Sequence, residues 1–437
     1  MTSIRTNMSL AAALHEAEEQ YSIANPKSHD RHQKACDYLP GGNTRTTLFY
    51  TPFPLTMARG EGARLWDLDG HVYTDFLGEY TAGIYGHSNS KIQSTIEHVL
   101  QSGIAFGAPN DYEAKLAELI CKRFPSCDKV RFCNSGTEGN LMALAAARAV
   151  TGRSHVLVFN GGYHGGAFNY MPGKMAMNAP FPTVIAEYND LEGTLALIET
   201  HAEQLAAILI EPMMGTGGGI SGDPVFLHSL REIATDKGIV LIFDEVMTSR
   251  LAPGGLQEKL GITPDMTTFG KYLGGGLTFG AFGGCDDIMG RFDPRHAEAF
   301  IHAGTYNNNV LTMAAGVTGL SEVFTPEAAV SLNAAGDELR GRLLDLASRH
   351  RVPVKVMGLG SILFIHFQEQ EISRPADTQA TDPAARALFH LHMLSKGYNI
   401  ARMGFMSLSL PLMPEDYDGF VEAFEDFISL YGTVLRN

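Results

Sequence analysis

The central part of the chain, from about residue 110 to residue 300, alternates short apolar runs with segments of helical periodicity. The runs typical of buried strands lie at residues 130–133, 156–159, 207–210 and 239–243. The helical segments between them are residues 141–150, 191–201 and 226–237. Strands that alternate with helices pair in parallel, because a helix must carry the chain back to the start of the next strand. The pattern therefore predicts an α/β fold whose mostly parallel sheet is covered by helices on both faces.

The two ends of the chain do not follow this alternation. Residues 1–40 are polar and partly helical, and residues 65–73 are typical of a hairpin that turns at Asp69-Gly70. The part after about residue 325 contains, in order, a helix at 328–350, strands near Val356 and Ile362, and a final helix from Pro414 onward. These segments predict a smaller α+β lobe.

Composition excludes several classes of function. The 437 residues contain 48 acidic and 33 basic side chains, and this net charge of −15, without a basic run, opposes binding to nucleic acid. The five cysteines show no C-x-x-C spacing, so we expect neither a disulfide framework nor a zinc site. No signal-peptide pattern and no run of about 18 apolar residues is present, so we expect a cytoplasmic protein without a membrane span.

Lys271 is the only charged residue between Asp265 and Asp286. An apolar environment favours the neutral amine, which is the form that attacks an aldehyde, and the glycines around it allow close approach of a ligand. A lysine that extends outward from a buried strand is the alternative. Lys174 is similarly isolated, so isolation alone does not decide between the two.

Asp244 follows the apolar run at residues 239–243, at the expected end of a buried strand. Ligands of parallel α/β sheets bind beyond the carboxyl ends of the strands. A carboxylate there can keep a pyridinium nitrogen protonated, although an acid that caps the next helix is the alternative. Asp244 and Lys271 together indicate a cofactor that carries both an aldehyde and a pyridine ring.

Two polar turns supply further candidates. Ser135, Gly136 and Thr137 lie between a predicted strand and a predicted helix, where free N–H groups and hydroxyls suit a phosphate, although an ordinary helix cap has the same composition. Tyr163 lies between glycines and can stack on a flat ring, with a core tyrosine as the alternative. His164 beside it is a candidate contact or a structural histidine, and the turn at residues 304–309 is open to a phosphate or to solvent.

Taken in order, these segments resemble the class III aminotransferases of fold type I over nearly the whole chain. The matching segments are NSGTE (134–138), GYHG (162–165), EP (211–212), FDEV (243–246), TFGK (268–271) and GT (304–305). The resemblance implies pyridoxal 5′-phosphate as the cofactor, and a large domain with a mostly parallel seven-stranded sheet beside a small domain built from both chain ends. The implied boundaries are residues 1–75, 76–325 and 326–437.

The resemblance also implies the residues of the site. Lys271 and Asp244 are the implied catalytic pair, and no metal ligand is implied. The implied cofactor contacts are Ser135, Gly136, Thr137, Tyr163, His164, Glu211, Asp244, Val246, Met247, Lys271 and Thr305. The family pattern implies a homodimer with active sites at its interface, in which Thr305 reaches the phosphate of the neighbouring subunit.

Within the class, the chain is similar to the branch of glutamate-1-semialdehyde 2,1-aminomutases, and more similar to bacterial β-phenylalanine (β-amino acid) aminotransferases. The stretches that carry this similarity are residues 48–54, 79–83, 244–252 and 407–411. Arg45 and Arg402 match positions that this subgroup uses for substrate carboxylates, which a guanidinium binds bidentately. A surface salt bridge is the alternative for either arginine. Met214, where many relatives carry glutamine, Met403 and the loop at residues 106–110 depart from the pattern.

The implied reaction moves an amino group from a β-amino acid, such as the aromatic β-phenylalanine, to a 2-oxo acid such as 2-oxoglutarate or pyruvate by a ping-pong mechanism. An aminomutase would shift the amine within one molecule, and Arg45 opposes it because small residues are usual there in that branch. A decarboxylase or racemase would need no amino acceptor. A non-catalytic cofactor-binding regulator is opposed by the intact pair of Lys271 and Asp244.

Overall fold

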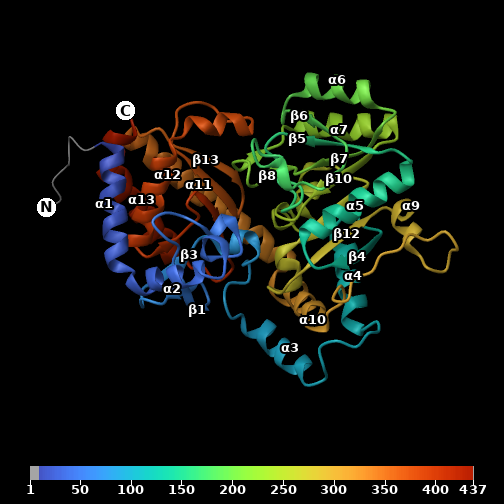
Figure 1. Ribbon diagram of the computed structural model, residues 1–437, viewed down its shortest axis with the longest axis horizontal. Coiled ribbons are helices and arrows are strands. Elements are labelled where there is room, and N and C mark those ends of the chain that lie inside the picture. Colours follow the sequence, from blue (N-terminus) through green and yellow to red (C-terminus); the bar gives the residue numbers. More distant parts are fainter. Residues whose placement is uncertain (1–8, 437) are drawn as a thin grey trace.

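The computed structural model describes residues 9–436 and centres on a seven-stranded sheet (Figure 1). In their order across the sheet, the strands are β4 (Lys129–Cys133), β12 (Gly280–Gly284), β11 (Met266–Gly270), β10 (Val240–Asp244), β7 (Leu205–Ile210), β5 (His155–Phe159) and β6 (Thr183–Ala186). Of these strands, β12 runs antiparallel to both its neighbours and the others share one direction. The predicted mostly parallel sheet is therefore confirmed.

Helices cover both faces of this sheet because its strands are apolar on both sides. Along β10, Leu241 and Phe243 pack in the cluster formed with α7 (Pro224–Lys237). Val240 and Ile242 pack on the opposite face in the cluster formed with α5 (Gly136–Thr151). Side chains alternate along a strand, so Asp244 at the end of β10 faces the α5 side. The helices predicted at residues 141–150, 191–201 and 226–237 are confirmed by α5, α6 (Leu191–His201) and α7.

Strand β12 lies outside the predicted pattern because three of its five residues are glycines, which are depleted in strands. The glycines have a steric reason. A Cβ at Gly280 would lie 2.1 Å from the carbonyl oxygen of Ser135, and one at Gly284 would lie 2.4 Å from that of Asp265. Glycine thus lets the turn before α5 approach the sheet closely, which brings Ser135 to the carboxyl end of the parallel strands.

The two ends of the chain meet in a second lobe beside this sheet, where the first and last parts of the sequence lie together in Figure 1. One small sheet has the order β1 (Met57–Glu61), β2 (Arg64–Asp67), β3 (Val72–Asp75) and β15 (Tyr398–Asn399). A second has the order β13 (Lys355–Leu359), β14 (Ile362–His366) and β16 (Phe405–Ser407). The helices of this lobe include α11 (Pro326–His350), α12 (Pro383–Ser395) and α13 (Pro414–Leu435). The expected hairpin, C-terminal strands and final helix are confirmed, and the three domain boundaries stay a prediction.

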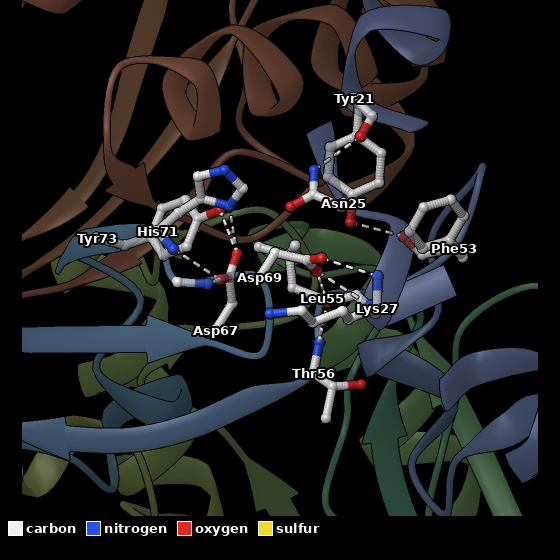
Figure 2. A network of polar contacts seen from close by, with 12 residues as sticks. Tyr21, Asn25, Lys27, Phe53, Leu55, Thr56, Asp67, Asp69, His71 and Tyr73 are labelled. Carbon is white, nitrogen blue, oxygen red and sulfur yellow. Dashed lines mark hydrogen bonds and ion pairs between the residues drawn. The ribbon is translucent and has the colours of Figure 1, made fainter. Parts of the chain in front are cut away.

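A polar network fastens the N-terminal helices to this lobe (Figure 2). The Asp69 carboxylate, at the hairpin turn, accepts hydrogen bonds from the backbone N–H groups of Lys27 at 2.8 Å and Ser28 at 3.0 Å. These N–H groups belong to the first turn of α2 (Pro26–Cys36), whose cap residue Asn25 provides no side-chain cap. A carboxylate is stabilising at a helix N-terminus, where the N–H groups lack partners within the helix. The chain beyond α2, which includes Arg45, therefore starts from a fixed position.

The remaining α-helices of the described residues are α1 (Leu10–Ala24), α3 (Ser90–Leu100), α4 (Asp111–Arg123), α8 (Gly255–Leu260), α9 (Asp286–Met289) and α10 (Val310–Thr318). Helix α1 confirms the helical part of the N-terminal prediction, and Leu10, Leu14 and Ala17 pack against the core. Residues 1–8 of that predicted segment lie outside the described residues. Across residues 9–436, no helix combines the length and the apolar character needed to cross a membrane.

Candidate active site

Lys271 follows directly after β11 at the carboxyl end of the parallel strands. Its side chain is partly buried, and Nζ donates a hydrogen bond to the carbonyl oxygen of Tyr80 at 2.8 Å. Its backbone φ of 59° lies in the left-handed region, which is uncommon for a residue other than glycine. Burial lowers the pKa of Lys271 to about 8, and the positive charge of Arg45 contributes to the shift. More of the amine is therefore neutral and nucleophilic near neutral pH than in an exposed lysine.

Lys174, the other isolated lysine, lies in a different environment. It is exposed to solvent just before a short 3-10 helix, Met175–Met177, whose three residues are also not buried. Of the two lysines that the sequence left open, Lys271 is therefore the one that is partly buried at the carboxyl end of the sheet.

Asp244 is buried and each of its carboxylate oxygens accepts hydrogen bonds. Oδ2 lies 2.8 Å from both Asn140 Nδ2 and His164 Nδ1, and Oδ1 accepts from the backbone N–H of Val246 at 3.1 Å. Since a carboxylate only accepts hydrogen bonds, His164 carries its proton on Nδ1. These contacts fix the orientation of the Asp244 carboxylate at the end of β10.

Asn140 is a member of this network that the sequence analysis missed. It lies on α5, fully buried, and its Oδ1 accepts a hydrogen bond from Thr268 Oγ1 at 2.8 Å. Its Nδ2 also donates to the carbonyl oxygen of His164 at 3.0 Å. A single amide in a helix otherwise rich in alanine and leucine is the sequence signal that points to it. Asn140 thus joins three chain segments around Asp244.

The first turn of α5 contains hydrogen-bond donors that are available to a ligand. Ser135 is the N-cap, and its Oγ accepts from the backbone N–H of Glu138 at 3.2 Å, so its own hydroxyl proton remains available. Among residues 9–436, no acceptor is recorded for the N–H groups of Gly136 and Thr137. Two open N–H groups, a hydroxyl and the positive end of the helix dipole suit a phosphate.

Val246 holds this turn against the strand that precedes Lys271. A Cβ at Gly136 would lie 2.8 Å from a Val246 methyl group, and one at Gly270 would lie 3.2 Å from the other methyl. The two glycines therefore let Val246 pack between the start of α5 and the end of β11. This packing brings the candidate phosphate position and Lys271 to the same end of the sheet. Met247, the next residue, packs with its Sδ against the backbone of Gly215.

Glu211 connects two loops near Asp244. Its Oε1 accepts from the backbone N–H of Tyr163 at 3.0 Å, and its Oε2 accepts from that of Gly215 at 2.9 Å. Burial raises the pKa of Glu211 to about 7, the charge of His164 opposes this shift, and Asp244 adds to it. Both carboxylate oxygens are thus used by the backbone. Glu211 fixes the loop that carries Tyr163, whose side chain is partly buried.

Arg45 and Arg402 lie on different segments of the chain, and the charge of Arg45 acts on Lys271. Arg45 forms an ion pair with Glu79, and its guanidinium lies 5.5 Å from the centroid of the Tyr80 ring. Arg402 lies between β15 and β16, is partly buried, and has no ion pair with a carboxylate of residues 9–436. Phe405, three residues later, stacks on Tyr80 with ring centroids 5.7 Å apart. The Tyr80 ring therefore lies between the two arginine-bearing segments.

The other predicted positions are placed as follows. Thr305 is exposed on a turn whose Asn307 accepts a hydrogen bond from Asn134 Nδ2 at 3.0 Å. Met214 is buried in β8 (Met213–Met214), in the apolar cluster on the α7 side of the sheet. Met403 packs near Tyr80 and Met247 in a separate cluster.

The residues around Lys271 fit pyridoxal 5′-phosphate. Lys271 offers an amine of lowered pKa for the aldehyde, Asp244 offers an oriented carboxylate for the pyridine nitrogen, and the start of α5 offers open N–H groups for the phosphate. Glycines at Gly136, Gly165 and Gly270 let Val246 and Thr137 pack closely against the backbone around this site.

Comparison with known proteins agrees with this arrangement. The model of the family described as aminotransferase class-III matches residues 48–428. The chain therefore belongs to the class III aminotransferases, which are pyridoxal-phosphate-dependent enzymes.

The relatives lie in the branch that the sequence indicates. The chain is 48% identical to a β-phenylalanine transaminase from Variovorax paradoxus over 430 residues, which are 98% of this chain and 99% of that protein. The crystal structure of a β-phenylalanine aminotransferase from Variovorax paradoxus matches with a TM-score of 0.96 at 48% identity, over 98% of this chain and 99% of that one. A glutamate-1-semialdehyde 2,1-aminomutase of Brevibacillus brevis is 36% identical over 91% of this chain and 97% of that protein.

Proposed function

We propose that this aminotransferase takes its amino group from a β-amino acid with an aromatic side chain, such as β-phenylalanine. The amino group passes to a 2-oxo acid such as 2-oxoglutarate or pyruvate by a ping-pong mechanism. The observation that carries the proposal is the position of Arg45, whose guanidinium lies over the Tyr80 ring and whose charge acts on Lys271. Phe405, three residues after Arg402, stacks on the same ring. The 48% identity to a β-phenylalanine transaminase over nearly the whole chain supports the aromatic β-amino acid.

Lys271 and Asp244 are the proposed catalytic residues. When bound, the cofactor supplies an aldehyde that condenses with amines and a ring that withdraws electrons from the reacting carbon. With the cofactor bound, Lys271 Nζ would take the proton from the carbon that bears the amine and deliver the same proton to the former aldehyde carbon, and its lowered pKa leaves the amine free to accept that proton. Asp244 would hold the protonated pyridine nitrogen, and Asn140 and His164 keep the carboxylate oriented for this task.

The same proposal assigns the cofactor contacts. Ser135, Gly136 and Thr137 would hold the phosphate, and Thr305 of the neighbouring subunit would add a further contact. The Tyr163 ring would cover one face of the cofactor, while Glu211 fixes the backbone of that loop. The remaining predicted contacts are His164, Val246 and Met247. We propose that these three residues pack around the cofactor.

Arg45 and Arg402 bind the substrate carboxylates. Arg45 is proposed for the carboxylate of the β-amino acid because its charge acts on both Lys271 and Tyr163. Arg402 is proposed to bind the second carboxylate of an amino acceptor such as 2-oxoglutarate. A planar guanidinium binds a carboxylate through two parallel hydrogen bonds, which also orients the substrate.

The enzyme is proposed to act as a homodimer in the cytoplasm, with the three domain segments 1–75, 76–325 and 326–437. Two neighbouring loops expose large apolar side chains, namely Ile104, Phe106, Ile301 and Tyr306. The loops are joined by a hydrogen bond from Asn309 Nδ2 to the carbonyl oxygen of Ile104 at 3.4 Å. Large exposed apolar side chains on neighbouring loops support a subunit interface around Thr305. All five cysteines are free thiols, which suits a reducing compartment.

An absorbance measurement tests the proposed donor. We expect β-phenylalanine, added to the purified holoenzyme without a 2-oxo acid, to convert the spectrum of the lysine-bound cofactor into that of its amino form. Addition of 2-oxoglutarate should restore the first spectrum. An unchanged spectrum would exclude this donor. Complete product formation without any acceptor would favour an aminomutase instead.

A further inference from the structure

Residues 78–81 form a turn of unusual backbone conformation next to Lys271. The φ angles of Gly78, Glu79, Tyr80 and Thr81 are 52°, 47°, 52° and 81°, all in the left-handed region. Only glycine adopts this region without strain, and three of the four residues carry a side chain. Gly78 is required because a Cβ there would lie 2.3 Å from the carbonyl oxygen of Ser407. Strain of this kind persists only where the surroundings hold it, and it collects at functional sites.

The turn contacts the catalytic lysine through its backbone. The Tyr80 carbonyl oxygen accepts the hydrogen bond from Lys271 Nζ at 2.8 Å. The Tyr80 side chain is fixed on two sides, because its hydroxyl donates to the carbonyl oxygen of Thr47 at 3.0 Å and its ring stacks on Phe405. The strained conformation therefore points the Tyr80 carbonyl toward Lys271.

The same turn presents the carboxylate of Glu79 to Arg45. The Glu79 and Arg45 side chains are 51% and 41% exposed, and Glu79 is the carboxylate of residues 9–436 that pairs with Arg45. The pair lies close enough to Lys271 for Arg45 to lower the pKa of Lys271 and for Glu79 to raise it. The arginine proposed for the substrate carboxylate is thus already neutralised by a carboxylate of the chain.

We propose that Glu79 is the resident counter-ion of Arg45, and that a substrate carboxylate must exchange with it to bind. Glu79 is then a specificity-determining residue, because its negative charge reduces the affinity for carboxylate-bearing donors. The proposal rests on the proposed role of Arg45. Its physical basis is that a carboxylate beside an anion-binding arginine both occupies a donor and repels the incoming anion. The half-exposed position of Glu79 leaves room for its side chain to move into solvent.

Calorimetric titration of the holoenzyme with 3-phenylpropanoate tests this exchange. The probe has the carboxylate and aromatic ring of the donor but no amine, so it binds without reacting. Glu79→Gln keeps the shape and a hydrogen-bond acceptor for Arg45 but removes the charge. We expect this variant to bind the probe about three- to tenfold more tightly than the wild type, as loss of one nearby charge implies. Unchanged or weaker binding would overturn the proposal.

Two further variants make the result specific. Glu61→Gln removes an exposed carboxylate that pairs with Arg59 at 3.5 Å and lies on β1, so its affinity for the probe should equal that of the wild type. Tightening by Glu61→Gln as well would show a general charge effect and overturn the assignment to Glu79. Arg45→Gln should weaken binding of the probe. If Arg45→Gln binds normally, the proposed function of Arg45 fails, whereas weakening by Arg45→Gln without tightening by Glu79→Gln removes only this inference.

Discussion

The proposed cofactor side of the site, around Asp244, and the proposed substrate side, around Arg45, differ in how far their polar side chains are buried. On the cofactor side, Asp244, Asn140 and His164 are buried, and their hydrogen bonds connect strand, helix and loop. On the substrate side, Arg45 and Glu79 are each about half exposed and form an ion pair at the edge of the site. Buried polar groups are costly to leave unpaired, whereas exposed ion pairs contribute little to stability.

The difference indicates which part of the site tolerates change. A substitution on the cofactor side leaves a buried partner unsatisfied and should reduce both stability and turnover. A substitution on the substrate side should alter the affinity for substrates and leave the fold intact. The following variants test this division.

The largest effect is expected at the catalytic lysine. Lys271→Ala removes the amine that moves the proton, so we expect turnover to fall by about 10⁴-fold or more. The measurement is the steady-state rate with β-phenylalanine and 2-oxoglutarate. Lys174→Ala is the matched control, since Lys174 is exposed, and its rate should equal that of the wild type. Near-normal turnover of Lys271→Ala would contradict the assignment.

Asn140→Ala tests the buried network behind Asp244. The variant leaves Thr268 Oγ1 without its acceptor and removes one donor to Asp244, so we expect the free energy of unfolding to fall by about 2–4 kcal/mol. Turnover should fall about ten- to hundredfold because the carboxylate loses its orientation. Urea unfolding and steady-state kinetics measure the two effects.

Thr268→Val gives the double-mutant control for this network. Because Asn140 and Thr268 share one hydrogen bond, the double variant should lose less stability than the sum of the two single variants. Simple additivity would show that the two side chains act independently, and the division between the two sides of the site would lose its main support.

Arg402→Gln tests the substrate side. We expect the KM for 2-oxoglutarate to rise about tenfold or more, because one bidentate ion pair is lost, while the melting temperature stays close to that of the wild type. Arg342→Gln is the control, since Arg342 pairs with Asp418 at 2.8 Å away from the site. A drop in kcat at unchanged KM would place Arg402 outside the carboxylate site.

The last effect concerns stability alone, at a buried histidine behind Arg402. His390 Nδ1 lies 3.1 Å from the carbonyl oxygen of Ile400, and burial, with a contribution from Arg402, lowers the pKa of His390 to about 3. A lowered folded-state pKa means that the unfolded chain binds the proton first as the pH falls. The contribution of the neutral His390 ring to the free energy of unfolding is therefore fully present above about pH 6.5. Below that pH the free energy of unfolding decreases, by at most about 1.4 kcal/mol per pH unit.

His390→Asn should make this decline shallower between pH 6 and pH 4, as measured by urea unfolding at several pH values. His98→Asn is the control because His98 is exposed near the end of α3, and its pH dependence should match that of the wild type. An identical slope for His390→Asn and the wild type would show that His390 does not remain neutral in the folded enzyme.

The sequence predicted the parts of the site that depend on short segments. Continuous apolar runs indicate buried strands, so the ends of β4 and β10, with Ser135 and Asp244, could be found by local reasoning. Lys271 was found from its isolation among uncharged residues, although the strand before it, β11, was not predicted. Nor did the sequence predict β12, whose glycines are needed for close approach to Ser135 and carry no strand signal of their own. It also did not predict Asn140, because its partner Asp244 lies 104 residues away.

The sequence by itself determined the parallel sheet, the family and the two residues proposed to carry the chemistry, because periodic apolar patterns and short motifs are properties of contiguous residues. Only the tertiary structure decided that Lys271 donates to a carbonyl 191 residues away, on a strained turn, and that Glu79 neutralises Arg45. The same holds for the pairing of β3 with β15 from opposite ends of the chain. Such contacts form only when distant segments are packed together, since the burial of the core as a whole, and not any local preference, holds them in place.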